Sequence, residues 1–314
     1  MEELNQTSVT EFILLGITDI SWLKIPFVIT FLILYMVSLV GNLSIVIVVM
    51  YDHNLHTPMY LLLSNLSFLD FCYSTTTVPK MLAGLVMNNK KIYFTSCIAQ
   101  LYFFHFFGST EALLLTSMSY DRYVAICNPL RYQVLMAKNI CISLAFSSWA
   151  TSFFYSLTHT VLASRLPFCK FNKVDHFLCD IKPLLKLACS DTRLNESLVS
   201  IITGFIGLAS FALIVISYGF IGSHLLNIHS SLGRHKALST CTSHLTVVLM
   251  FYGTAVSIYI RPATKNSLEQ DRQAAILYTA ITPALNPLIY ALRNKDVKIA
   301  FKKHIQRLFN KCIY

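Results

Sequence analysis

The chain has 314 residues, of which 55% are hydrophobic and only 13% are charged, and its mean hydropathy is +0.58. Soluble domains of this size carry more charge, so the composition excludes a soluble globular protein and indicates an integral membrane protein. The net charge of +10 is concentrated partly in a basic C-terminal tail, which favours attraction to anionic lipid and not to nucleic acid.

Apolar segments long enough to cross a bilayer recur along the chain. They cover residues 25–50, 59–86, 93–126, 140–162, 198–228, 238–260 and 274–292. We therefore predict an all-α membrane protein, a bundle of seven transmembrane helices whose two ends lie on opposite sides of the membrane. The expected parts are an N-terminal tail (1–22), the bundle (23–292) with a long second extracellular loop (164–195), and a cytoplasmic amphipathic helix and tail (293–314).

Three features of the polar segments predict an extracellular N-terminus. The last twenty-two residues carry seven Lys and Arg residues, and such positive charge is typical of the cytoplasmic side. Asn5 begins an Asn-Gln-Thr tripeptide, which is either a glycosylation site or an unused acceptor. Cys169, Cys179 and Cys189 cluster in one loop, as expected on an oxidising side.

Cys97, at the outer end of the third segment, makes four cysteines on the predicted extracellular side, and four cysteines permit three pairings. The others fall in helices or on the reducing side, where we expect free thiols: Cys72, Cys127, Cys141, Cys241 and Cys312. Cys312 is either a palmitoylation site or a plain exposed thiol.

The third segment carries a stripe of residues that cannot face lipid. Cys97 and Arg122 are twenty-five residues apart, which is about seven helical turns and about 37 Å, so they lie on one face at opposite ends of a membrane-crossing helix. Steps of three and four residues add Leu101, Phe104, Gly108, Glu111, Leu115 and Met118 to this stripe. A thiol, a carboxyl and a guanidinium on one face predict that the stripe looks into protein.

Two acids and two amides reach the middle or inner half of the predicted bundle. Asp70 and Glu111 lie about 18 Å and about 16 Å from the cytoplasmic ends of their helices, and Asn42 and Asn286 about 14 Å and about 10 Å. Two carboxyls brought close cannot both stay ionised without a cation or a shared proton. We predict a polar cluster that binds one or the other at rest and changes occupancy on activation. The alternative is a static hydrogen-bond network between helices.

Several runs of residues resemble those of a known family. Met-Ser-Tyr-Asp-Arg-Tyr-Val-Ala-Ile-Cys at 118–127 is similar to the third helix of vertebrate olfactory receptors, the tetrapod-type branch of the rhodopsin-like G-protein-coupled receptors, with Ser119 where that family usually has Ala. Leu-His-Thr-Pro-Met-Tyr at 55–60 and the run 234–244 resemble the same family, with Leu62 and Leu238 in place of Phe. The resemblance covers residues 41 to about 309.

This resemblance implies an odorant receptor of the plasma membrane. Such a receptor binds a small volatile ligand within the bundle and activates a heterotrimeric G protein, here of the olfactory stimulatory type, which raises cyclic AMP. The resemblance implies the disulfides Cys97–Cys179 and Cys169–Cys189, and sodium at Asp70 as the one cofactor candidate, with Glu111 beside it. It implies that activation depends on Asp121, Arg122, Tyr123, Tyr218, Asn286, Pro287 and Tyr290. For Asp121 and Arg122, the alternative is a membrane-edge ion pair of little consequence.

We expect the ligand beneath the disulfide-held loop, in the outer third of the third, fifth, sixth and seventh segments. The candidate lining residues, for each of which the alternative is ordinary interhelical packing, are Phe104, His105, Gly108, Ser109, Ala112, Phe205, Ile206, Tyr259, Tyr278 and Thr279. This mainly apolar wall suits weakly polar ligands. No acid lies in this layer of the third segment, which disfavours an amine held by a salt bridge.

No enzyme signature is present: the chain lacks Gly-x-Ser-x-Gly, His-Glu-x-x-His and a phosphate loop, so we expect no catalytic activity. The alternative class is a small transporter or channel, motivated by Asp70 and Glu111, but the chain has no internal repeat and no matched pair of broken helices. We predict no metal at the inner ends of the fifth and sixth segments, because the spacings fit no standard zinc site for His224, His229, His235, Cys241 and His244.

Overall fold

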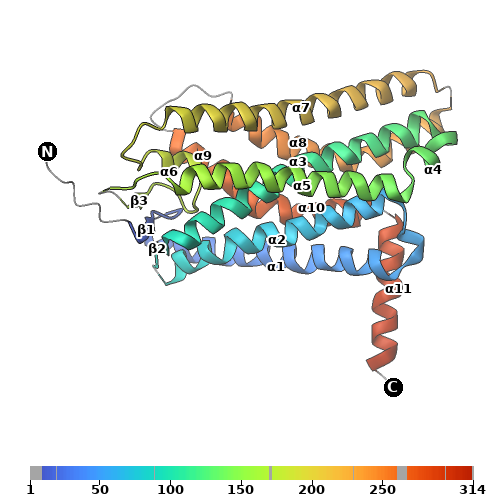
Figure 1. Cartoon of the computed structure of the whole chain (residues 1–314). Helices are drawn as coiled ribbons and strands as arrows, with labels where there is room; N and C mark the ends of the chain where they lie inside the picture. Colours follow the sequence, from blue (N-terminus) through green and yellow to red (C-terminus); the bar gives the residue numbers. More distant parts are fainter. Residues whose placement is uncertain are drawn as a thin grey trace, which may run out of the picture.

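A computed structural model gives the structure of the chain and describes residues 9–18, 20–87, 89–169, 172–228, 230–259, 267–293 and 295–312 (Figure 1). Within these residues, seven long helical segments run side by side as a bundle, which confirms the predicted all-α fold. The first six are α1 (Ser21–Tyr51), α2 (Pro58–Val86), α3 (Phe94–Cys127), α5 (Lys138–Ser164), α7 (Arg193–Leu226) and α8 (Ser231–Tyr259). The seventh consists of α9 (Ser267–Ile276), a π-helical segment (Leu277–Ile281) and α10 (Thr282–Arg293).

Shorter elements join or flank these helices. They are the 3-10 helices His53–Leu55 and Pro129–Arg131, the one-turn helices α4 (Tyr132–Leu135) and α6 (Ile181–Leu185), and α11 (Lys295–Cys312). α11 leaves the bundle at a steep angle at the end that also carries α4 (Figure 1). We call this the α11 end; the opposite end, which carries the strands, is the sheet end.

The helices extend beyond the apolar segments that predicted them. α7 begins at Arg193 and not near residue 198, and α8 begins at Ser231 and not near residue 238. α1 begins at Ser21, inside the expected tail. Hydropathy marks only the hydrocarbon layer, whereas a helix can continue with polar residues into the headgroup region.

The charged residues in the middle of the long helices face the inside of this bundle, and its outer surface is apolar. By length and composition, the helices in the described part of the chain that are apolar enough to cross a membrane are α1, α5 and α7. Among the other long helices, α2 and α3 carry Asp70 and Glu111, which are both fully buried. On the outer surface, Phe205 is 73% exposed and Phe146 is 71% exposed. Such a surface suits lipid as the surrounding solvent.

α3 is the central helix, because it packs against α2, α5, α7 and α8. The predicted stripe is on its protein-facing side: Cys97, Leu101, Glu111 and Leu115 are all inaccessible to solvent. The close packing of α1 against α10 depends on a residue without a side chain. A Cβ at Gly41 of α1 would lie 2.8 Å from the Pro287 ring of α10, so only glycine allows these two helices to approach so closely.

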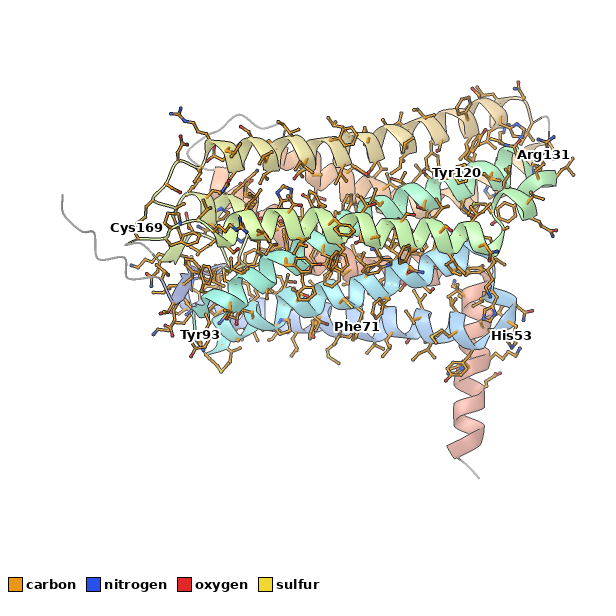
Figure 2. All side chains as sticks on the ribbon, viewed as in Figure 1. His53, Phe71, Tyr93, Tyr120, Arg131 and Cys169 are labelled. Carbon is orange, nitrogen blue, oxygen red and sulfur yellow. A yellow bond between two sulfur atoms is a disulfide. The ribbon has the colours of Figure 1, made fainter. Side chains whose placement is uncertain are left out.

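A small sheet and two disulfides close the sheet end. The strands β1 (Glu11–Leu14), β2 (Lys91–Tyr93) and β3 (Lys173–Val174) are arranged in the order β2-β1-β3, with β1 antiparallel to β2 and parallel to β3. The disulfides join Cys97 to Cys179 and Cys169 to Cys189, the pairs that the family resemblance implied. Figure 2 shows Tyr93 and Cys169 at this end, with His53 and Arg131 at the other.

The N-terminal segment is therefore more than a polar tail. Phe12 of β1 is fully buried, and its ring contacts those of Phe94 and Phe168 at centroid distances of 6.0 and 5.3 Å. Phe12 belongs to a hydrophobic core at the sheet end, separate from the core of the bundle, that includes Cys97 and Cys179. This core attaches the segment before α1 to the loop that follows α5.

We predict that Phe12→Ala lowers the thermal stability of the purified protein, because removing a buried phenyl ring typically costs about 3–5 kcal/mol. The matched control is Glu11→Ala, which removes only a surface ion pair with Lys91 at 3.1 Å, a type of pair worth about 0–1 kcal/mol. Equal unfolding temperatures for the two variants would show that β1 is not anchored through Phe12.

Candidate functional site

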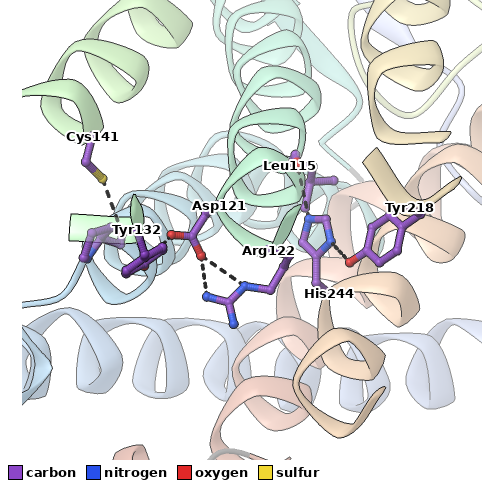
Figure 3. A network of polar contacts seen from close by, with 8 residues as sticks. Leu115, Asp121, Arg122, Tyr132, Cys141, Tyr218 and His244 are labelled. Atoms are coloured by element: carbon purple, nitrogen blue, oxygen red, sulfur yellow. Dashed lines mark hydrogen bonds and ion pairs between the residues drawn. The ribbon is translucent and has the colours of Figure 1, made fainter. Parts of the chain in front are cut away.

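A buried ion pair lies at the α11 end of α3. Asp121 and Arg122 are only 1% and 8% exposed. Arg122 Nε donates to Asp121 Oδ2 at 3.0 Å, and Nη2 donates to the same oxygen. A buried guanidinium needs such a partner, because an unpaired charge in this environment is strongly unfavourable. The two residues therefore act as one unit in this state (Figure 3).

Tyr132 of α4 completes this unit from the adjoining loop. Its hydroxyl donates to Asp121 Oδ1 at 2.7 Å. Burial, together with the Asp121 carboxylate, raises the pKa of Tyr132 above its ordinary value, so the hydroxyl keeps its proton and remains a donor. Asp121 thus accepts hydrogen bonds from Arg122 and from Tyr132 at the same time.

His244 ties α8 to two other helices (Figure 3). Its Nε2 lies 3.0 Å from the carbonyl oxygen of Leu115 on α3, and its Nδ1 lies 2.7 Å from the hydroxyl of Tyr218 on α7. A carbonyl only accepts, so Nε2 carries the proton; in the neutral tautomer Nδ1 then accepts from the tyrosine. The side chain is 2% exposed. One imidazole therefore holds α3, α7 and α8 together near the α11 end.

In the sequence, His244 belongs to the family-like run 234–244 and to a set of residues whose spacing fits no zinc site, and neither observation predicts this structural role. The sequence signal that could have found this role is the spacing of Cys241, His244, Val248 and Tyr252, which follow one another in steps of three and four on one helix face. In the structure all four residues are buried. Within the described residues, no group of three or more His, Cys, Asp or Glu side chains is placed to hold a metal ion. His229 lies outside the described residues.

The other predicted activation residues lie around this region. Tyr123 is half-buried, and its ring is 5.8 Å from that of Phe220 on α7. Tyr290 of α10 is 1% exposed and lies close enough to interact electrostatically with both Asp70 and Arg122. It is thus placed between the Arg122 unit and the buried acids of the middle layer.

The structure brings the predicted polar cluster together in part. Asn286 Nδ2 donates to Asp70 Oδ2 at 2.8 Å, and Glu111 lies close enough to interact with Asp70 electrostatically. Asn42 instead donates to the Pro283 carbonyl at 2.9 Å. All four members of the predicted cluster are at most 1% exposed.

Several oxygen atoms of this polar cluster have no hydrogen-bond partner among the described residues. They are Asn42 Oδ1, Asp70 Oδ1, Asn286 Oδ1 and both carboxyl oxygens of Glu111. Amide and carboxylate oxygens are the ligands that hard cations prefer. The donor set therefore fits a small cation such as sodium, and a proton shared between the two acids would meet the same need in part.

The predicted ligand-lining residues divide into three groups. The residues that are half-buried or buried, on α3, α7 and the last helical segment, are Phe104, His105, Gly108, Ser109, Ala112, Ile206, Tyr278 and Thr279. Phe104 contacts the Tyr278 ring at a centroid distance of 5.6 Å. The side chain of Tyr259 lies outside the described residues, as do Asn5 and the side chain of Cys312.

Phe205 does not belong to this group, and we withdraw it from the candidate pocket. It is 73% exposed, on the same outer face as Ile201 and Leu208, whereas Ser210 is the buried residue of that stretch. In a helix that faces lipid on one side, the large apolar residues mark the outer face and the small polar ones the inner face.

Comparison with known proteins identifies the family. The family model described as olfactory receptor matches residues 31–309. The chain is 51% identical to human olfactory receptor 12D1 over 97% of this chain and 95% of that protein, and 52% identical to human olfactory receptor 12D3 over 95% of each. Mouse olfactory receptor 8U9 is 48% identical over 97% of each chain.

The fold has a solved counterpart in squid rhodopsin, with a TM-score of 0.73 over 94% of this chain and 89% of that one, at 16% identity. That likeness concerns the fold alone, whereas the sequence matches extend over nearly the whole chain. The chain belongs to the olfactory receptor family of rhodopsin-like G-protein-coupled receptors, which are multi-pass receptors of the plasma membrane and not enzymes.

Proposed function

We propose that this protein is an odorant receptor that binds a small volatile molecule among the sheet-end halves of α3, α7, α8 and α9–α10. Binding activates a heterotrimeric G protein of the olfactory stimulatory type and raises cyclic AMP. The observation that carries this proposal is the network at the α11 end, in which Arg122 is held by Asp121 while His244 holds α8 against α3 and α7. Such a network can be opened by a change elsewhere in the bundle.

The proposed orientation places the sheet end outside the cell. Both disulfides lie at that end, as expected of an oxidising compartment, and the basic helix α11 lies at the opposite end (Figure 1). Residues 1–22 and 164–195 are then extracellular, with a glycan on Asn5, and residues 293–314 are cytoplasmic. The exposed Lys302 and Lys303 would face anionic lipid of the inner leaflet.

Activation follows from contacts that differ between two states. A ligand that favours an outward position of α8 must break the two hydrogen bonds of His244. These bonds together contribute about 1–3 kcal/mol, which corresponds to a resting preference of about 5- to 150-fold. Binding of a small ligand can supply a differential affinity of this size.

Once His244 releases it, Tyr218 can turn toward Arg122, with Tyr290 packing beneath. The guanidinium then exchanges Asp121 for contacts with the C-terminal helix of the G protein. Pro287 breaks the hydrogen-bond ladder of α10 next to the π-helical segment, which gives the last helix a hinge close to Tyr290.

The buried acids are proposed to stabilise the resting state by holding a sodium ion at Asp70 and Glu111. The oxygen atoms without hydrogen-bond partners support this assignment, and Asn286, which already binds Asp70, would complete the site. The alternative, a proton shared between the two carboxyls, needs no sodium. The two differ in their response to salt.

We predict that Arg122→Ala abolishes the cyclic AMP response to an activating odorant while surface staining persists, because the contact point for the G protein is lost. The measurement is a cyclic AMP assay in cells that express the intact chain, stimulated with a broad odorant panel. Arg193→Ala, at an exposed arginine of the sheet end, is the matched control and should respond normally. A full response from Arg122→Ala would contradict the mechanism.

We predict that His244→Phe raises basal cyclic AMP several-fold without ligand. The phenyl ring fills a similar volume but cannot bond Leu115 or Tyr218, so α8 loses its tie to α3 and α7. Thr242→Val, at an exposed position of the same helix, is the control. Unchanged basal signalling at normal surface expression would show that His244 does not restrain α8.

We predict that sodium chloride stabilises the purified receptor against heat more than choline chloride does. At a sodium concentration ten times the dissociation constant, the gain is about 1.4 kcal/mol. Glu111→Gln should abolish this difference, whereas Glu196→Gln, at an exposed glutamate, should preserve it. Equal stability of the unmodified receptor in both salts would favour the shared proton.

A further inference from the structure

An acid, two histidines and a helix N-terminus meet at the sheet end, where α3, α5 and α6 come together. His105 of α3 has its Nε2 3.3 Å from Asp180 Oδ1, and Asp180 caps α6 by accepting from the Ile181 amide at 2.6 Å. The neighbouring Cys179 is held by its disulfide to Cys97 and by a 3.0 Å hydrogen bond from its amide to Gln100. The loop therefore delivers a carboxyl to a fixed position beside α3.

This acid changes the expected chemistry of the ligand pocket. The sequence shows no acid in this layer of the third segment, but the loop supplies one. Burial by itself raises the pKa of Asp180, but the contact with the His105 ring and the hydrogen bond from the Ile181 amide outweigh it, so the pKa falls below its ordinary value. Asp180 is therefore a carboxylate near pH 7 and acts only as an acceptor.

The nearby His176 does not neutralise this carboxylate. Burial lowers the pKa of His176, and its Nδ1 accepts from the Leu178 amide at 3.2 Å, as a neutral ring does. Arg272 is paired with Asp175, the residue before His176. Asp180 keeps a side chain that is 20% exposed, so it is open on one side to a further donor.

His159 of α5 is a second histidine at this place, and its ring has no hydrogen-bond partner among the described residues. The side chain is fully buried. Its ring lies 6.1 Å from that of His105 and 4.6 Å from that of Tyr155, centroid to centroid. One oxygen atom can bridge two ring nitrogens up to roughly 5.8 Å apart, which is two hydrogen bonds of usual length. A buried donor and acceptor without partners indicate a missing polar group.

We propose that Asp180, His105 and His159 form the polar anchor of the ligand pocket and bind the hydroxyl group of a small alcohol; this rests on the proposed function. A hydroxyl both donates and accepts, so it can donate to Asp180 and accept from an imidazole N–H. The hydrocarbon part then lies along the neighbouring apolar wall of Phe104, Gly108 and Ala112, one and two turns along α3.

Ligands of other chemistry fit this anchor less well. An ether or aldehyde of the same length can only accept, so its oxygen would face the carboxylate without a proton between them. A ligand carboxylate would be repelled by Asp180. Because a hydrogen bond to a charged partner is among the stronger kinds, the alcohol should be preferred by about tenfold to a hundredfold.

The test uses the intact receptor in a cyclic AMP assay with ligands matched in carbon skeleton: a primary alcohol, its methyl ether, the aldehyde, the carboxylic acid and the amine. We expect the half-maximal concentration of the alcohol to be at least about tenfold below those of the ether and aldehyde, with the acid inactive. Asp180→Asn should reduce this ratio to below about threefold and allow the acid to act. His159→Phe should weaken the alcohol and leave the ether unchanged.

Asp191→Asn, an equivalent change at an exposed position of the same loop, is the matched control and should keep the full preference for alcohol. The ether response reports folding and coupling of each variant independently of the anchor. Equal potency of alcohol and ether, an unchanged ratio in Asp180→Asn, or activation by the amine alone would overturn the anchor. If no compound of any class evokes a response that depends on Arg122, the proposed function itself fails.

Discussion

The structure depends on one electrostatic constraint: a guanidinium buried at the α11 end of α3 must always have an anionic or polar partner. In this state the partner is Asp121, its neighbour in the chain, which also receives the hydroxyl of Tyr132. Both members of the pair lie on α3. It therefore needs no other helix, and the other helices remain free to move around it.

The restraint on that movement comes from a different residue. His244 connects α8 to a backbone carbonyl of α3 and to a side chain of α7. Each bond is individually weak, which suits a switch, since a strong lock could not be opened by a small ligand. Tyr290 lies between this network and the buried acids. The Arg122 unit, the His244 hydrogen bonds and the buried acids are thus linked by a few side chains in an otherwise apolar interior.

The two ends of α3 are held by different kinds of interaction. At the sheet end, the disulfide to Cys179, the buried Phe12 and the sheet hold the loop firmly over the bundle. The same tether fixes Asp180 beside His105, which gives a rigid polar corner within the proposed pocket. A rigid corner at one end and breakable hydrogen bonds at the other are consistent with a receptor that binds at the first and responds at the second.

The linear sequence by itself determined the seven helices and the inward stripe of α3, because these depend on local hydropathy and helical spacing, while the family resemblance of the sequence indicated Asp121 and Arg122. Only the tertiary structure decided that Phe205 faces outward, that β1 joins a sheet and that Asp180 meets His105. Phe205 lies in a strongly apolar helix, where its own hydropathy does not decide which face it occupies. The pairing of β1 and the contact between Asp180 and His105 join segments that are distant in sequence. Both depend on helix rotation and on the path of a loop, which local sequence does not determine.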